Sequence, residues 1–188
     1  MFSRSSIFAG MLALAALCGA RDALAQGAFT LSSPDFKDGE RLALKNAGNN
    51  KANPNCLGQN ISPTLSWSNA PEGTKSFALL MVDPEGRPPG GVIHWVAYGI
   101  PASVAGFAEG EVSKPSEKYV GGLGSAKLSN YTGPCTPAGP IHHYTFTLMA
   151  TDLEPTALAP GLTREELIKA LEGHVKVATG LIGIFSKP

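Results

Sequence analysis

Two carboxylates and two imidazoles stand at the ends of apolar runs in this sequence. Asp83 and Glu85 follow one such run, His94 opens the next, and His142 opens a third with Tyr144 two residues later. A carboxylate can hold an imidazole in its charged form or in one tautomer, and imidazole N–H groups donate to phosphate or carboxylate oxygens. The residue types therefore predict a small polar pocket that takes an anionic group, with the Tyr144 hydroxyl as a further donor.

Other chemistries need patterns that this sequence lacks. A metal site usually shows a His-x-x-x-His pair or a close ligand cluster, and a serine hydrolase shows Gly-x-Ser-x-Gly. We therefore expect no metal, no cofactor and no catalytic residue. The alternatives are a hydrolase in which Asp83 orients His94 or His142 as a general base, and a structural role in which the histidines are core residues, Asp83 caps a turn and Glu85 is a solvated charge.

The start of the chain has the pattern of an export signal. Arg4 precedes a short apolar stretch, and 23–25 is Ala-Leu-Ala, a small-x-small cleavage site. The apolar stretch is too short to cross a bilayer. We predict a signal peptide over residues 1–25, a single domain over residues 26–188, a periplasmic or secreted location, and no transmembrane segment.

The charge balance argues against nucleic acid as a partner, and the cysteine content predicts a disulfide. Lys and Arg together number 15, as do Asp and Glu, so there is no excess of basic residues for nucleic acid. Cys56 and Cys135 remain after the predicted cleavage, and an even count in an exported chain favours a disulfide. The bridge would contribute up to about 4–5 kcal/mol. Buried free thiols are the alternative, and the CxxC spacing of a metal site is absent.

Glycine and proline, 22 and 15 residues, separate short apolar runs, which is typical of a β-rich sandwich. A capping box at Thr163 and Glu166 predicts one helix that ends near Gly173. Strict alternation places His94 on the face of its strand that also carries Val96 and Tyr98. The long Asn/Gly-rich loop over 45–63 suggests a function or a bridge. Strands are expected over 29–32, 65–67, 76–82, 92–100, 142–151 and 175–185.

The motifs taken together resemble the phosphatidylethanolamine-binding protein family, in particular its bacterial Raf-kinase-inhibitor-like (YbhB/YbcL-type) branch. The resemblance implies a mostly β fold, with two packed antiparallel sheets in a Greek-key-like sandwich, a C-terminal helix and short peripheral helices. It also implies a binding protein, not an enzyme, whose ligand is a small anion or a phospholipid head group. A second possibility is a modulator of a protein partner, such as a protease inhibitor. The motifs are Asn60-Ile61-Ser62-Pro63, Leu65-Ser66-Trp67, Pro71 to Phe77, Asp83-Pro84-Glu85, His94-Trp95, Gly133-Pro134-Cys135, His142-His143-Tyr144 and Glu172-Gly173-His174.

The family pocket, carried onto this chain, consists of Asp83, Glu85, His94, His142 and Tyr144. The sequence departs from the family pattern at two positions. Glu85 stands where Asp is commoner, and His143, the neighbour of His142, stands where the family has Arg. A permanent, fork-shaped cation is thereby replaced by a group that titrates near neutrality. Alternation points residue 143 away from its neighbour, so we expect it to support the pocket without touching the ligand.

Overall fold

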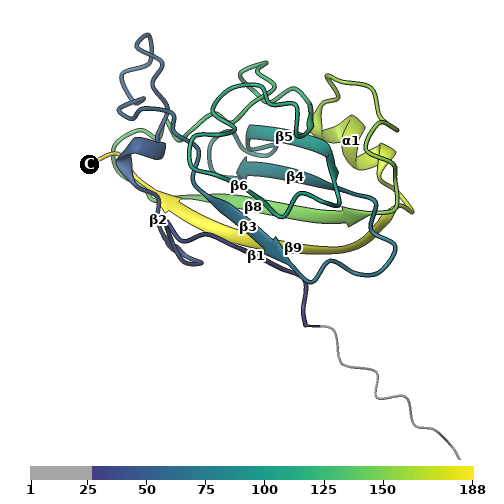
Figure 1. Ribbon diagram of the computed structural model, residues 1–188. Helices are drawn as coiled ribbons and strands as arrows, with labels where there is room; N and C mark the ends of the chain where they lie inside the picture. The colour runs from purple at the N-terminus through teal and green to yellow at the C-terminus, as the bar shows by residue number, and fades with distance from the viewer. Residues whose placement is uncertain (1–26) are drawn as a thin grey trace, which may run out of the picture.

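The computed structural model describes residues 27–188, and the predicted signal peptide over 1–25 lies outside them. The described part of the chain forms two β-sheets, one α-helix and one short 3-10 helix (Figure 1). The β-rich fold and the six expected strands are therefore confirmed, with small differences at their ends. The elements are β1 (Thr30–Ser32), β2 (Glu40–Arg41), η1 (Leu44–Asn46), β3 (Leu65–Ser68), β4 (Ser76–Asp83), β5 (Val92–Pro101), β6 (Gly106–Phe107), β7 (Val120–Gly121), β8 (His142–Thr151), α1 (Arg164–Ala170) and β9 (Val175–Phe185).

The larger sheet carries the site. Its strand order is β2-β9-β8-β4-β5-β7, and the smaller sheet has the order β1-β3-β6. All pairs are antiparallel except the two-residue pairing of β2 with β9. Strand β4 lies between β8 and β5, which explains its continuous apolar sequence: both of its faces are covered.

Two apolar layers cover the two faces of the larger sheet. On one face Phe77 and Trp95 pack with Trp67 and Phe107 of the smaller sheet. On the other face β4 and β5 pack against α1, whose Leu167 is fully buried. Alternate residues of the central strands thus belong to different cores, and the sheet is a rigid platform between them.

The helix begins as its capping box predicts. The Thr163 side chain accepts a hydrogen bond from the Glu166 backbone, and the Glu166 carboxylate accepts one from the Thr163 backbone. Gly173 lies just beyond the helix and has a φ of 79°, a left-handed conformation that glycine adopts readily. None of the helices in residues 27–188 has the length and apolar character that crossing a bilayer requires.

The predicted face of His94 is wrong. Met81 pairs with Trp95 and the next residue, Val82, pairs with Ile93, so His94 is an extra residue in β5. Such a β-bulge lets consecutive side chains point to the same face. The His94 ring consequently lies against Tyr144, on the Trp95 side of the sheet, with ring centroids 5.0 Å apart. Strict alternation would have placed it in the opposite layer.

Candidate anion-binding site

Asp83 and His142 meet because they stand at the end and the start of neighbouring antiparallel strands, β4 and β8. The His142 Nδ1 atom lies 2.8 Å from Asp83 Oδ2, and the two side chains are 9% and 4% exposed. The second oxygen, Oδ1, accepts a hydrogen bond from the Glu85 backbone. A carboxylate can only accept, so Nδ1 of His142 carries a proton and Nε2 is the ring nitrogen left for a ligand.

The loop after β4 approaches this pair closely. A Cβ atom at Gly86 would lie 2.9 Å from Asp83 Oδ2 and 2.6 Å from a Val92 methyl group. Only glycine fits there without displacing one of them. The residue thereby lets the loop fold over the carboxylate at the rim of the hollow.

The bulge brings His94 to the same place. Its Nδ1 lies 2.8 Å from the Thr132 carbonyl, which can only accept, so Nδ1 carries the proton. Burial lowers the pKa of His94, against the hydrogen bond to Thr132, and the ring is therefore neutral near pH 7. A neutral ring protonated at Nδ1 leaves Nε2 as an acceptor, suited to an O–H or N–H group of a ligand.

Tyr144 completes the wall. Its hydroxyl and the Thr136 hydroxyl are 2.6 Å apart, and the tyrosine is 1% exposed. Burial raises the pKa of Tyr144, so it stays a neutral hydroxyl at any physiological pH. It can donate to an anion when Thr136 donates to it.

These side chains surround a hollow of about 220 Å³. A volume below the roughly 300–1,000 Å³ of typical small-molecule sites suits a compact group such as phosphate. Four of the five predicted residues line the hollow, and so do two that sequence reasoning missed, Asn53 and Arg87. The signal for Arg87 was present: it is the one permanent cation in the Pro/Gly-rich loop between β4 and β5. The four predicted lining residues are Asp83, His94, His142 and Tyr144.

Glu85 lies beside the hollow and is not one of its lining residues. Its Oε1 atom is 2.8 Å from His143 Nδ1, and its Oε2 accepts the His143 backbone N–H. Burial raises the pKa of Glu85, but the hydrogen bonds from the His143 ring and backbone outweigh it and lower the pKa to about 2. The histidine that replaces the family arginine thus keeps a partner for Glu85, on the outer face as alternation predicted.

Ligand-type atoms of Asp83, Glu85 and His142 lie within 4.8 Å of one another, close enough for a metal ion. Each already has a partner inside the protein: Asp83 bonds to the imidazole of His142, and Glu85 bonds to His143. These hydrogen bonds explain why the three residues lie close together beside the hollow, and we assign no ion to the cluster.

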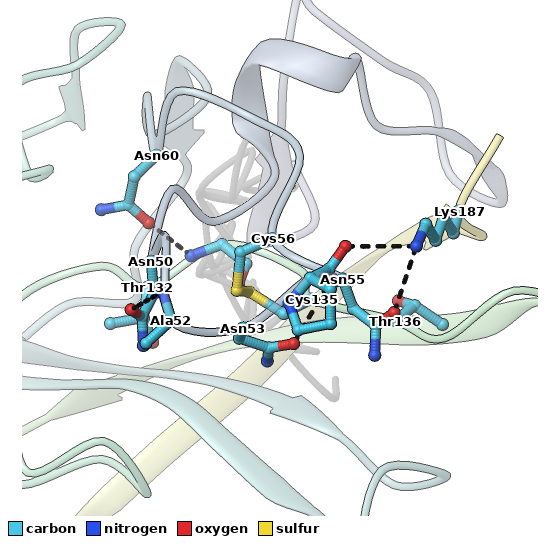
Figure 2. Close-up of a disulfide and its surroundings, with 12 residues drawn as sticks. Asn50, Ala52, Asn53, Asn55, Cys56, Asn60, Thr132, Cys135, Thr136 and Lys187 are labelled. Atoms are coloured by element: carbon cyan, nitrogen blue, oxygen red, sulfur yellow. Dashed lines mark hydrogen bonds between the residues drawn. A yellow bond between two sulfur atoms is a disulfide. The ribbon is translucent and has the colours of Figure 1, made fainter.

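The predicted disulfide between Cys56 and Cys135 is confirmed. Figure 2 shows it among residues of the asparagine-rich loop, which it joins to the segment that precedes β8. The loop is fixed further because the Gly48 and Asn60 backbones bond to Pro134 and Ala47. The bridge therefore holds a long loop against the hollow, which Cys135 also lines.

Comparisons with known proteins agree with this architecture. The family model described as phosphatidylethanolamine-binding protein matches residues 32–186. The Escherichia coli protein YbhB is 31% identical over 160 residues, which are 83% of this chain and 99% of YbhB. A protein of Methanothermobacter thermautotrophicus is 37% identical over 134 residues, 70% of this chain and 87% of the relative.

Solved structures give the same result. The crystal structure of E. coli YbcL, described as a new member of the mammalian PEBP family, superposes with a TM-score of 0.76 at 27% identity, covering 84% of this chain and 98% of YbcL. A putative homologue from Chlamydia trachomatis superposes with a TM-score of 0.73 at 32% identity, covering 86% of this chain and 99% of that one.

Proposed function

Because this chain belongs to the phosphatidylethanolamine-binding protein family, we propose that it is a binding protein whose hollow beside Asp83 and His142 takes a small anion. The anion is free phosphate or the phosphate of a phospholipid head group, which share the same oxygens. One observation carries the proposal: side chains from the three separate strands β4, β5 and β8 converge on one hollow of about 220 Å³.

The proton positions decide how an anion is held. A neutral His142 offers a lone pair at Nε2, which repels an anionic oxygen, whereas a protonated His142 offers an N–H. The Asp83 carboxylate, 2.8 Å from the ring, is the counter-charge next to a protonated His142. Binding of a fully ionised anion therefore takes up a proton at His142, while neutral His94 accepts from a hydroxyl or ammonium group of the ligand.

Binding is favoured over catalysis by the groups that line the hollow. Cys135 is in a disulfide, and the Thr136 hydroxyl is occupied by Tyr144. A nucleophile beside a base is what covalent hydrolysis needs, and neither side chain offers one. The disulfide also supports a periplasmic or secreted location, because such bonds persist in oxidising compartments.

Isothermal titration calorimetry with inorganic phosphate and with phosphoethanolamine tests the function. We expect saturable binding of both and its loss in His142→Ala, while His174→Ala, a histidine far from the hollow, binds as the unchanged chain does. Sedimentation with phosphatidylethanolamine vesicles separates the sources: lipid binding requires co-sedimentation that free phosphate competes away. Absence of saturable binding, or full binding by His142→Ala, would contradict the proposal, and turnover of a phosphoester would replace it with an enzyme.

A further inference from the structure

A second and larger hollow adjoins the first. Its volume is about 460 Å³, within the roughly 300–1,000 Å³ that small-molecule sites occupy. A ligand with its anionic end in the smaller hollow can extend into the larger one, because the two share part of their walls. The shared residues are Asn53, Arg87, Val92, His94 and Cys135.

One wall of the larger hollow consists of amide side chains from the 48–60 loop. The Oδ1 atoms of Asn50 and Asn53 accept hydrogen bonds from the backbones of Ala52 and Asn55. These bonds fix the amides, and the structure shows no partner among residues 27–188 for the two Nδ2 groups. The wall therefore presents oriented N–H donors, held in place by the disulfide at Cys56, and needs little rearrangement to bind.

The lining of the larger hollow also includes apolar side chains. The larger ones are Val92 and Ile93 of β5 and Leu128 of the segment over 125–128. Leu128 is 49% exposed, so a ligand would cover it. A lining that combines N–H donors with apolar groups matches a sugar ring, which has hydroxyl edges and C–H faces. An acyl chain would leave the amide donors buried without partners, at a cost of about 1–3 kcal/mol each.

Arg87 stands at the junction of the two hollows. Among the described residues, it is the only charged one that lines the larger hollow and the only permanent cation that lines the smaller one. No carboxylate among residues 27–188 forms an ion pair with it. The guanidinium fork suits phosphate oxygens. It supplies near the hollow the fixed charge that His143, turned outward to Glu85, does not.

We propose that the two hollows form one site for a soluble sugar phosphate. The phosphate lies in the smaller hollow, Arg87 grips it at the junction, and the ring lies between the amides and Leu128. This assignment rests on the anion-binding function proposed above and adds the chemical class of the ligand. It also names Asn50 and Asn53 as the residues that select a hydroxylated body over a lipid tail, and Arg87 as a contact of the phosphate.

The test compares three probes by calorimetry on the full chain: inorganic phosphate, glucose 6-phosphate and n-hexyl phosphate. Two or three added hydrogen bonds of about 1 kcal/mol each predict that glucose 6-phosphate binds at least about tenfold more tightly than phosphate. Hexyl phosphate has the same anion and an apolar body, and its affinity should exceed that of phosphate by a smaller factor than the affinity of glucose 6-phosphate does. If hexyl phosphate binds as tightly as glucose 6-phosphate or more tightly, the assignment is overturned in favour of a lipid tail.

Substitutions show which hollow provides the additional affinity for glucose 6-phosphate. Ala126→Trp fills the larger hollow without touching the smaller one, since Ala126 lines only the former. It should reduce glucose 6-phosphate binding to the level of phosphate, whereas Leu57→Trp, at an exposed position that lines neither hollow, should not. Arg87→Gln should weaken all three probes by about tenfold, and Arg87→Lys by less because it keeps the charge.

The outcomes separate the two proposals. If inorganic phosphate and the two esters all fail to bind, the anion-binding function and the sugar-phosphate site both fall. If phosphate binds and the sugar adds nothing, or if Ala126→Trp leaves the gain intact, only the larger subsite falls and the anion pocket stands.

Discussion

Two histidine–aspartate pairs in this protein have the same contact and opposite surroundings. His142 with Asp83 and His174 with Asp152 both have an Nδ1–carboxylate distance of 2.8 Å. The side chains of the first pair are 9% and 4% exposed, and those of the second are 45% and 47% exposed. The first lies in a hollow beside a second imidazole, while the second lies at the far ends of β8 and β9, where it joins the two strands.

The comparison shows that a hydrogen bond between an imidazole and a carboxylate does not by itself make a binding site. Water and salt screen the two charges of the exposed pair, so their attraction is weak. The hydrogen bond from His174 lowers the pKa of Asp152, and this pair lines neither of the two hollows. Burial strengthens electrostatic interactions at the inner pair, and His142 lines the hollow in which we propose that an anion binds.

The largest difference between the two pairs is expected when the aspartate of each is replaced by asparagine and phosphate affinity is measured. Asn at either aspartate keeps the shape and an acceptor for the histidine but removes the charge. In Asp83→Asn the protonated His142 loses its counter-charge, and phosphate affinity should fall at least about tenfold. Direct repulsion between Asp83 and the anion opposes this effect, but both oxygens of the carboxylate already accept hydrogen bonds, from the His142 ring and from the Glu85 backbone.

Asp152→Asn is the matched control for this experiment and should bind phosphate within about twofold of the unchanged chain, because no ligand group is near it. Calorimetry measures both. Equal losses in the two variants, or a gain in Asp83→Asn, would show that the buried pair is not the one that holds the anion.

The pH dependence of anion affinity tests whether a charged imidazole holds the anion. Sulfate is the better probe because phosphate esters change their own charge near pH 6. Burial lowers the pKa of His94 and raises the pKa of Tyr144, and both shifts favour the neutral groups. Because a protonated imidazole in the hollow binds an anion better than a neutral one, sulfate should bind about tenfold more tightly at pH 5.5 than at pH 8. A flat profile would mean that neutral donors and Arg87 hold the anion instead.

The smallest effect is expected at the outer pair beside the hollow, Glu85 and His143, which are 40% and 50% exposed. The pKa of Glu85 is about 2 in the folded chain and 4.5 in its ordinary range. A lowered pKa stabilises the fold above pH 4.5, and that contribution disappears as the pH falls from 4.5 towards 2. Solvent screening limits it to under about 1 kcal/mol.

Urea denaturation of Glu85→Gln measures this contribution. The variant should be slightly less stable than the unchanged chain at pH 7 and equal to it near pH 2, with phosphate affinity changed by less than about threefold. A large loss of phosphate binding would place Glu85 inside the site, as the family resemblance implies.

Much of the fold could be predicted from residue patterns. The β8 segment over 142–151 alternates between core and outer residues, and the capping box at Thr163 fixes the start of α1. Cysteine parity predicted the bridge between Cys56 and Cys135. These features are local or follow from a count, so no knowledge of distant contacts was needed.

The site itself depends on two features that local patterns do not encode. The bulge at His94 arises from the pairing of β5 with β4, and alternation alone gave the wrong face. The exclusion of Glu85 from the hollow follows from its bond to His143, a residue 58 positions away. Arg87 was overlooked because a charged loop residue is usually solvated, and only the shape of the two hollows gives it a place.

The four histidines of the chain allow one direct test. Long-range proton–nitrogen NMR spectra of the imidazoles, recorded during titration with phosphate, report on each ring. The account predicts saturable shifts for His94 and His142, with His142 Nε2 gaining a proton, and unchanged signals for His174. Shifts confined to His143 and His174, or no saturable shift at any ring, would contradict it.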